Sequence, residues 1–385
     1  MFSAQSQRKF IESYADLFLL IGCIVVLSIV PLLRAESSFI IGREAYSIFR
    51  MAENPATWDS LSYGGRFAAY TWGTALLVSI KPRLLSQLLP PLFGFLAFLC
   101  LWGIFKSFGL EANTRRIALA ITVASPPFIF LFSTLNSTFV AITLSLFGLY
   151  CLARDHKIIS AIAFIIMPIF NLPVSLISLM LLFIITFFAK KREFYWLIFI
   201  CTAIVATAYY LTLAKYAGNP EKLAFSLMEL GMQSKLQTYF SDLGGKFGLS
   251  VFGVILAMLG IVHGWKKKYE NLAVFFCLFI LVILMFLTNY AIFFINFFVA
   301  ILAAYALMSV ASKGWESSTL KNFTILVMVC GLIFSSVSFM DRHIAADPTP
   351  EVMQALEIFK DNDQGVTFSH YTRGYWLEYA GKKTV

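Results

Sequence analysis

LAVFFCLFILVILMFL, at residues 272–287, is followed after three residues by AIFFINFFVAILAAYALMSVA, at residues 291–311. Neither stretch contains a charged residue. A helix that crosses the apolar core of a bilayer needs about 20 mostly apolar residues, within a range of roughly 17–25. The two stretches therefore predict two consecutive membrane-spanning helices, Leu272–Leu287 and Ala291–Ala311, and similar stretches recur along the chain.

The composition of the whole chain agrees with a membrane protein. Of its 385 residues, 59% are hydrophobic and 13% are charged, whereas soluble domains are roughly 45–50% apolar and about 25% charged. The net charge of +9 fits basic loops that face an anionic cytoplasmic leaflet, so we expect no nucleic-acid partner. The six cysteines all lie in apolar stretches, which predicts neither a disulfide nor a metal site.

Apolar stretches of this kind predict an all-α polytopic membrane protein with about eleven transmembrane helices. The predicted spans are Leu17–Leu33, Leu84–Phe105, Arg116–Phe132, Phe139–Ala153, Ile158–Phe170, Val174–Ala189, Phe194–Leu213, Gly248–Trp265, Leu272–Leu287, Ala291–Ala311 and Leu320–Met340. One further run, Phe67–Ile80, has only about fourteen residues, so its length suggests an interfacial or re-entrant helix.

Basic residues fix the predicted orientation. If Phe67–Ile80 does not cross, all the basic connections fall on one side of the membrane, as the positive-inside rule requires. These connections contain Lys106/Arg115/Arg116, Arg154/Lys157, Lys190/Lys191/Arg192, Lys266/Lys267/Lys268 and Lys313/Lys321. The N-terminus is then predicted to be cytoplasmic and the C-terminus extracytoplasmic.

The predicted topology divides the chain into a transmembrane domain, 1–340, and a short extracytoplasmic tail, 341–385. Two longer outer loops interrupt the first domain, at 34–83 with interfacial helices and at 214–247. In the tail, Thr349 and Pro350 predict a helix start, and Gly365 precedes an expected strand, so we expect a short α/β segment. The inner connections are too short to build a site, which places chemistry on the outer face.

The first outer loop contains an acidic residue among arginines and aromatic residues. Glu44 lies close in sequence to Arg43, Tyr46 and Arg50. Arginine offers a two-pronged donor for phosphate, and a carboxylate beside it can take a proton from an acceptor hydroxyl. The pattern suits an anionic, lipid-linked substrate. A solvated amphipathic helix that lies on the membrane, with Tyr46, Phe49 and Trp58 as interface anchors, is the alternative.

The order of these residues resembles a known superfamily. Gly42-x-Glu44-x-Tyr46-x-x-x-Arg50, followed by Asp59-x-x-Ser62-Tyr63-Gly64-Gly65-Arg66, resembles the first luminal loop of GT-C glycosyltransferases. It is most similar to prokaryotic relatives of dolichyl-phosphate-mannose mannosyltransferases and of the oligosaccharyltransferase catalytic subunit. Ser125–Thr138, Asp242–Gly248 and Gly365–Lys383 extend the resemblance. It implies the plasma membrane of a prokaryote.

The resemblance also implies roles for individual residues. Glu44 takes the place of the catalytic carboxylate, which is usually aspartate in such enzymes, and the donor is a polyprenyl-phosphate sugar. The residues predicted to bind substrate are Arg43, Tyr46, Arg50, Asp59, Arg66, Asp242, Lys246 and Arg373. For Asp242 a helix cap or turn is an alternative role.

A metal-binding acidic pair, which the oligosaccharyltransferase branch carries on a later outer loop, is missing. The matching turn, Phe132 to Thr138, has no Asp or Glu, and a hard cation needs several oxygen ligands. This favours a metal-independent branch that uses a lipid-monophosphate sugar. We expect no cofactor, with a divalent cation left open.

Two alternatives to a glycosyltransferase stay open. A transporter or flippase for lipid-linked sugars would need ionisable groups in mid-membrane, and the predicted spans hold almost none. A catalytically silent GT-C-like subunit would fit the Glu44 substitution and the turn without carboxylates. The expected partners are a lipid-linked sugar donor, membrane lipids and other membrane protein subunits.

Overall fold

A computed structural model describes residues 4–34, 41–53, 58–59, 66–67, 72–188, 192–217, 239–245, 247–265, 272–346, 348–360, 366–367, 373–380 and 383–384. The regular structure in these residues is almost all helical, as the sequence predicts. The helices are α1 (Ala4–Arg34), α2 (Arg43–Glu53), α3 (Trp72–Val78), α4 (Pro82–Ser107), α5 (Ala112–Val123), α6 (Pro126–Ser133), α7 (Phe139–Ala153), α8 (Lys157–Phe170), α9 (Leu172–Phe188), α10 (Arg192–Ala217), η3 (Ser241–Leu243), α13 (Val251–Gly264), α14 (Leu272–Leu287), α15 (Ala291–Ser312), α16 (Ser318–Ile344), α17 (Pro350–Lys360) and α18 (Gly374–Tyr379).

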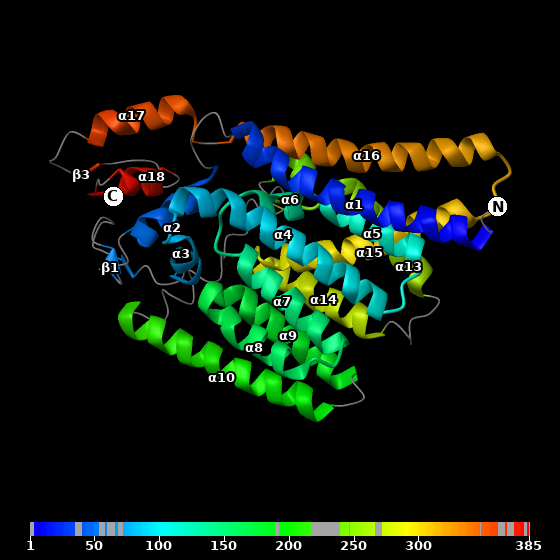
Figure 1. Cartoon of the computed structure of the whole chain (residues 1–385), viewed down its shortest axis with the longest axis horizontal. Coiled ribbons are helices and arrows are strands. Elements are labelled where there is room, and N and C mark those ends of the chain that lie inside the picture. The colour runs from blue at the N-terminus through cyan, green and yellow to red at the C-terminus, as the bar shows by residue number, and fades with distance from the viewer. Residues whose placement is uncertain are drawn as a thin grey trace.

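The long helices form one bundle, and the short elements gather at one of its ends. Figure 1 shows α2, α3, β1 (Trp58–Asp59), α17 and α18 on the left, whereas α1 begins at the opposite end. Helix α15 lies at the centre, packed against α13 and α5, and 78% of its apolar segment is buried. In α10 and α16 only 22% is buried. Apolar helix faces that the protein does not cover must face lipid, so α10 and α16 belong to the periphery.

Several helices are suited to cross a membrane. Among the described residues, α1, α4, α10, α15 and α16 are each long and apolar enough to do so, and the bent pair α5–α6 makes a sixth if it is one span. Five further apolar helices, α7, α8, α9, α13 and α14, have 10–17 residues. The chain is thus a polytopic membrane protein. The count of about eleven crossings stays a prediction.

The predicted span Arg116–Phe132 is broken in the structure. It forms α5 and α6, which meet at an angle of 60°. Ser125, at the break, has extended backbone (φ −78°, ψ 139°) because the ring of Pro126 disfavours helical backbone in the residue before it. The Ser125 hydroxyl donates to the Thr122 carbonyl at 2.6 Å and accepts from the Asn296 amide of α15 at 2.7 Å. The break is therefore a satisfied, buried feature.

The ambiguous segment Phe67–Ile80 contains the short helix α3. Its seven residues, Trp72–Val78, reach only about 10 Å at the helical rise of 1.5 Å per residue, too little to cross a membrane. This agrees with the prediction that the segment does not cross. Gly73 packs directly on the end of α8, where a Cβ would overlap the Phe170 side chain and the Ile169 backbone. The helix is thus anchored in the bundle rather than lying free on its surface.

The tail begins as predicted. Helix α17 starts at Pro350, and the Thr349 hydroxyl accepts a hydrogen bond from the Val352 amide at 3.4 Å. Strand β3 (Val366–Thr367) pairs in parallel with β4 (Lys383–Thr384). Because each strand has two residues, the broader prediction of an α/β tail is not settled by this pairing.

Candidate functional site

Glu44 joins two segments that are far apart in the sequence. It lies in the first turn of α2, directly after Gly42, whose φ of +91° is a backbone conformation that glycine adopts readily. The Glu44 Oε1 atom accepts a hydrogen bond of 2.8 Å from the backbone N–H of Ser137, in the connection between α6 and α7. The predicted catalytic carboxylate therefore faces the turn that lacks carboxylates.

Two buried asparagines hold this turn. The Asn136 amide nitrogen donates to the Leu131 and Thr134 carbonyls, both at 2.9 Å, and its oxygen accepts from the first amides of the next helix. Asn171, at the junction of α8 and α9, donates to the hydroxyls of Ser137 and Thr138 at 3.3 and 3.4 Å. The Ser137 N–H is thus a positioned donor on a fixed turn.

The Glu44 carboxylate keeps one oxygen for chemistry. The side chain is half-buried, and in the part of the chain that the structure describes its only hydrogen bond is the one from Ser137. Because that bond uses Oε1, the second oxygen, Oε2, can accept a proton. A carboxylate held in this way can act as a general base.

Two predicted substrate-binding residues have partners inside the protein. Arg50 forms an ion pair of 3.6 Å with Glu378 of α18, and the two side chains are only 15% and 4% exposed. Tyr46 is buried, and its ring lies edge-on to the ring of Tyr379, with centroids 5.1 Å apart. These contacts fasten the tail to α2. A role of Arg50 or Tyr46 in substrate binding stays a prediction.

Asp242 makes the contacts expected of its alternative role, a helix cap, and its role in substrate binding stays a prediction. Its Oδ2 atom accepts from the Val251 amide at the start of α13, at 2.7 Å, and its Oδ1 accepts from the Ser335 hydroxyl at 2.5 Å. Arg342, which the sequence did not single out, donates to the neighbouring Ser241 carbonyl at 2.6 Å. This group ties η3 to α13 and α16.

The remaining predicted residues are placed only in part. The backbones of Asp59 and Arg66 face each other in the antiparallel pair of β1 (Trp58–Asp59) and β2 (Arg66–Phe67). Arg373 is exposed, and its carbonyl accepts from two amides of α18. Lys246 and the side chains of Arg43, Asp59 and Arg66 lie outside the described residues. Their grouping with Glu44 in one pocket stays a prediction.

Metal ligands do not cluster in the described residues, where no three His, Cys, Asp or Glu side chains come together. A groove of about 430 Å³ lies on α10, between residues 199 and 211, and holds none of the predicted site residues. The expectation that the protein uses no metal stays a prediction, because part of the outer face is not described.

Glu378, Ser137 and Asn171 escaped the sequence analysis as members of this region. Glu378 had a weak signal, since an isolated acidic residue among Trp376, Leu377 and Tyr379 needs a partner when buried. Ser137 had none, because it acts through its backbone.

The fold is that of an integral membrane protein with several apolar helices. Solved structures of one such protein, the oligosaccharyltransferase of Archaeoglobus fulgidus, have this fold. Its AglB structure with an inhibitory peptide and a dolichol-phosphate superposes with a TM-score of 0.64 over 94% of the present chain and 64% of that chain, at 13% identity. The structure with Zn and sulfate gives 0.66, with 95% and 62% covered, at 14% identity.

The present chain therefore spans somewhat less than two thirds of the oligosaccharyltransferase that it resembles. No model of a known family and no curated protein sequence matches it. At such low identity, the likeness shows the fold alone, and an activity has to be argued from the residues of the candidate site.

Proposed function

We propose that this protein is a glycosyltransferase that transfers a sugar from a polyprenyl-phosphate donor to an acceptor on the outer face of the membrane. The observation that carries the proposal is the Glu44 carboxylate, held at 2.8 Å by the Ser137 N–H within a GT-C fold. The dolichol-phosphate in the AglB structure supports a lipid-linked donor.

The proposed reaction uses Glu44 as a general base. The acceptor oxygen attacks the anomeric carbon of the sugar and gives its proton to Oε2 of Glu44. The bond from that carbon to the donor phosphate oxygen breaks, and the polyprenyl phosphate leaves with the electron pair. Because the Ser137 N–H binds Oε1, the carboxylate keeps its direction during the transfer. Arg43, Arg66, Lys246 and Arg373 are the proposed phosphate partners.

The orientation is part of the proposal. About eleven crossings, with a cytoplasmic N-terminus, place Glu44 and the tail on the extracytoplasmic side of a prokaryotic plasma membrane. Cysteines introduced at positions 267 and 382 should react with an impermeant thiol reagent from opposite sides. The exposed Cys330 must first be replaced. Labelling of both positions from one side would contradict the orientation.

Glu44→Gln tests the base directly. The amide still accepts the Ser137 N–H but has no basic oxygen at neutral pH, so the fold should persist while turnover falls by about 10²–10⁴-fold. Glu53→Gln, at the exposed last residue of the same helix, is the matched control and should keep wild-type turnover. Equal turnover of wild type and Glu44→Gln, with a polyprenyl-phosphate sugar in liposomes, would reject the assignment.

A catalytically silent GT-C-like subunit is the second candidate. It is favoured by one observation: Arg50 and Tyr46, both predicted to bind substrate, pack against α18 instead. Glu44→Asp separates the two, because it restores the carboxylate that is usual in the resembling family. If Glu44 is a functional base, the shorter aspartate should lower transferase activity. If the site has lost its activity, aspartate should restore some of it. A wild-type protein with no turnover on any lipid-linked donor supports the silent subunit.

A further inference from the structure

Basic and aromatic side chains form a second cluster, which takes no part in the proposed reaction. Lys106, at the end of α4, has its Nζ 5.5 Å from the centroid of the Trp102 ring. The guanidinium carbon of Arg115, in α5, lies 5.6 Å from the same ring. Both distances are within the range of cation–π contacts. One indole thus gathers two positive charges from two helices.

A third cation lies on the adjoining helix. The guanidinium carbon of Arg154, directly after α7, lies 5.7 Å from the Tyr150 ring. That ring packs on Gly103, the residue next to Trp102, so closely that a Cβ there would overlap it. The two aromatic rings therefore cover adjacent sides of α4. We call Trp102, Tyr150, Lys106, Arg115 and Arg154 the basic-aromatic cluster.

The three cations of this cluster form no ion pair within the described part of the chain. Among the residues that the structure describes, no carboxylate lies within 4.0 Å of Lys106, Arg115 or Arg154, although Arg116 pairs with Asp16 at 2.7 Å. The Nε atom of Arg115 is buried and has no acceptor there. Guanidinium and ammonium groups held together without counter-charges attract an anion, and arginine matches phosphate best.

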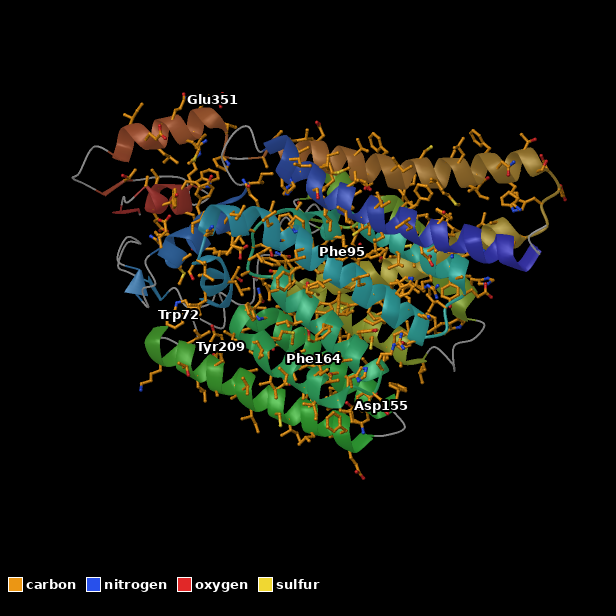
Figure 2. The ribbon with its side chains drawn as sticks, viewed as in Figure 1. Trp72, Phe95, Asp155, Phe164, Tyr209 and Glu351 are labelled. Carbon is orange, nitrogen blue, oxygen red and sulfur yellow. The ribbon has the colours of Figure 1, made fainter. Side chains whose placement is uncertain are left out.

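Exposed apolar residues flank the cluster and point to a lipid. Phe108, in the connection between α4 and α5, is 72% exposed, and Ile158, at the start of α8, is 75% exposed. Figure 2 shows Asp155, next to Arg154, at the end of the bundle away from Trp72 and Glu351. Cations beside outward-facing apolar side chains suit the headgroup region, where the charge meets phosphates and the apolar groups enter the acyl chains.

We propose that the basic-aromatic cluster binds the headgroup phosphate of an anionic phospholipid, in the leaflet opposite to the one that adjoins Glu44. Arg115 and Lys106 contact the phosphate, Trp102 keeps both cations extended, and Arg154 adds a third positive charge beside them. Phe108 and Ile158 hold the surrounding surface in the bilayer. The lipid is a structural ligand and undergoes no reaction.

The test compares lipids on the full-length protein. Purified protein is titrated in detergent with phosphatidylglycerol, phosphatidylcholine or inorganic phosphate, and bound lipid is counted by native mass spectrometry. We expect tight, saturable binding of one phosphatidylglycerol, at least 10-fold stronger than phosphatidylcholine, that weakens as salt rises. The double variant Lys106→Gln/Arg115→Gln should lose this preference. Lys313→Gln/Lys321→Gln removes the same charge from another connection and should keep it.

Trp102→Leu keeps all the charges of the cluster. It therefore tests the proposal independently if the double variant Lys106→Gln/Arg115→Gln does not fold. Without the ring, phosphatidylglycerol affinity should fall several-fold, because the cations lose their platform. Equal binding of the two lipids by wild type, or equal loss in both double variants, would overturn the proposal. Full competition by millimolar inorganic phosphate would show a site for a soluble anion and would overturn it as well.

Discussion

The ion pair between Arg50 and Glu378 allows a quantitative prediction about how the tail is held. Glu378→Gln removes the carboxylate charge and leaves a buried guanidinium opposite a neutral amide. Two unit charges 3.6 Å apart attract by about 5 kcal/mol at an effective dielectric constant of about 20. Removing one partner of a buried pair typically costs about 3–5 kcal/mol.

We expect the coupling energy between Arg50 and Glu378 to be smaller than these values because of the geometry of the pair. The closest atoms are 3.6 Å apart, beyond the usual charge-assisted hydrogen bond of about 2.7–2.9 Å, and Arg50 is 15% exposed. We therefore expect the pair to contribute about 1–3 kcal/mol. Since the pair joins α18 to α2, the loss should appear as local opening of α18 and not as unfolding of the bundle.

Hydrogen exchange of the α18 amides measures this opening. The Leu377 amide, which donates to the Arg373 carbonyl at 3.3 Å, should exchange about 5- to 150-fold faster in Glu378→Gln, as 1–3 kcal/mol requires. The control is Glu351→Gln in α17, whose carboxylate is exposed. A double-mutant cycle with Arg50→Met isolates the pair. Unchanged exchange, or a coupling below about 0.5 kcal/mol, would refute the reasoning.

Three further predictions concern packing, the turn and pH. Gly260→Ala should destabilise the protein by about 1–3 kcal/mol in thermal unfolding, because the new Cβ would overlap the α15 backbone, whereas Gly253→Ala, with no contact closer than 3.5 Å, should be tolerated. Asn171→Ala leaves two buried hydroxyls without their donor, which should cost about 1–3 kcal/mol and lower kcat more than KM for the proposed transfer; equal effects on both would contradict the positioning role. The Thr349 hydroxyl bond lowers the pKa of Glu351 from 4.5, so this group stabilises α17 above pH 4.5 and loses the effect as the pH falls through the lowered value. Hydrogen exchange in α17 should accelerate in that acidic window, and Thr349→Val, which removes the largest cause of the lowered pKa of Glu351, should weaken the dependence.

Most of the bundle followed from apolar stretches, but its central break did not. Pro126 and Pro127 indicate that a helix starts there, and the notion of one span from Arg116 to Phe132 ignored them. At the break, where α5 and α6 meet at 60°, the Ser125 hydroxyl accepts from the Asn296 side chain, which lies 171 residues further along the chain. A partner at that distance leaves no local pattern.

The sequence predicted those parts of the candidate site that consist of side chains, and it did not predict the part that is a backbone group. The resemblance placed Glu44 in the outer loop, and the structure gives it a partner, although its catalytic role awaits the test above. The turn from Phe132 to Thr138 was predicted to hold no metal because it lacks carboxylates. In the structure it supplies a backbone N–H, at Ser137, that binds Glu44. A role of Arg50 in substrate binding stays a prediction, and its ion pair with Glu378, 328 residues further along the chain, left no local pattern. Charge alone does not reveal whether a distant segment neutralises it.

The backbone donor at Ser137 also affects how this region tolerates change. Every amino acid except proline supplies the same N–H, so a small residue at position 137 keeps the contact with Glu44 and gives up only the hydroxyl that accepts from Asn171. Alanine scanning would therefore report the lost hydroxyl, and only proline, or an ester in place of the amide, would expose the contribution of the backbone donor. The contact depends instead on the side chains of Asn136 and Asn171, whose hydrogen bonds hold the turn in place. Saturation mutagenesis should find these two intolerant, whereas the buried position 137 should accept other small residues.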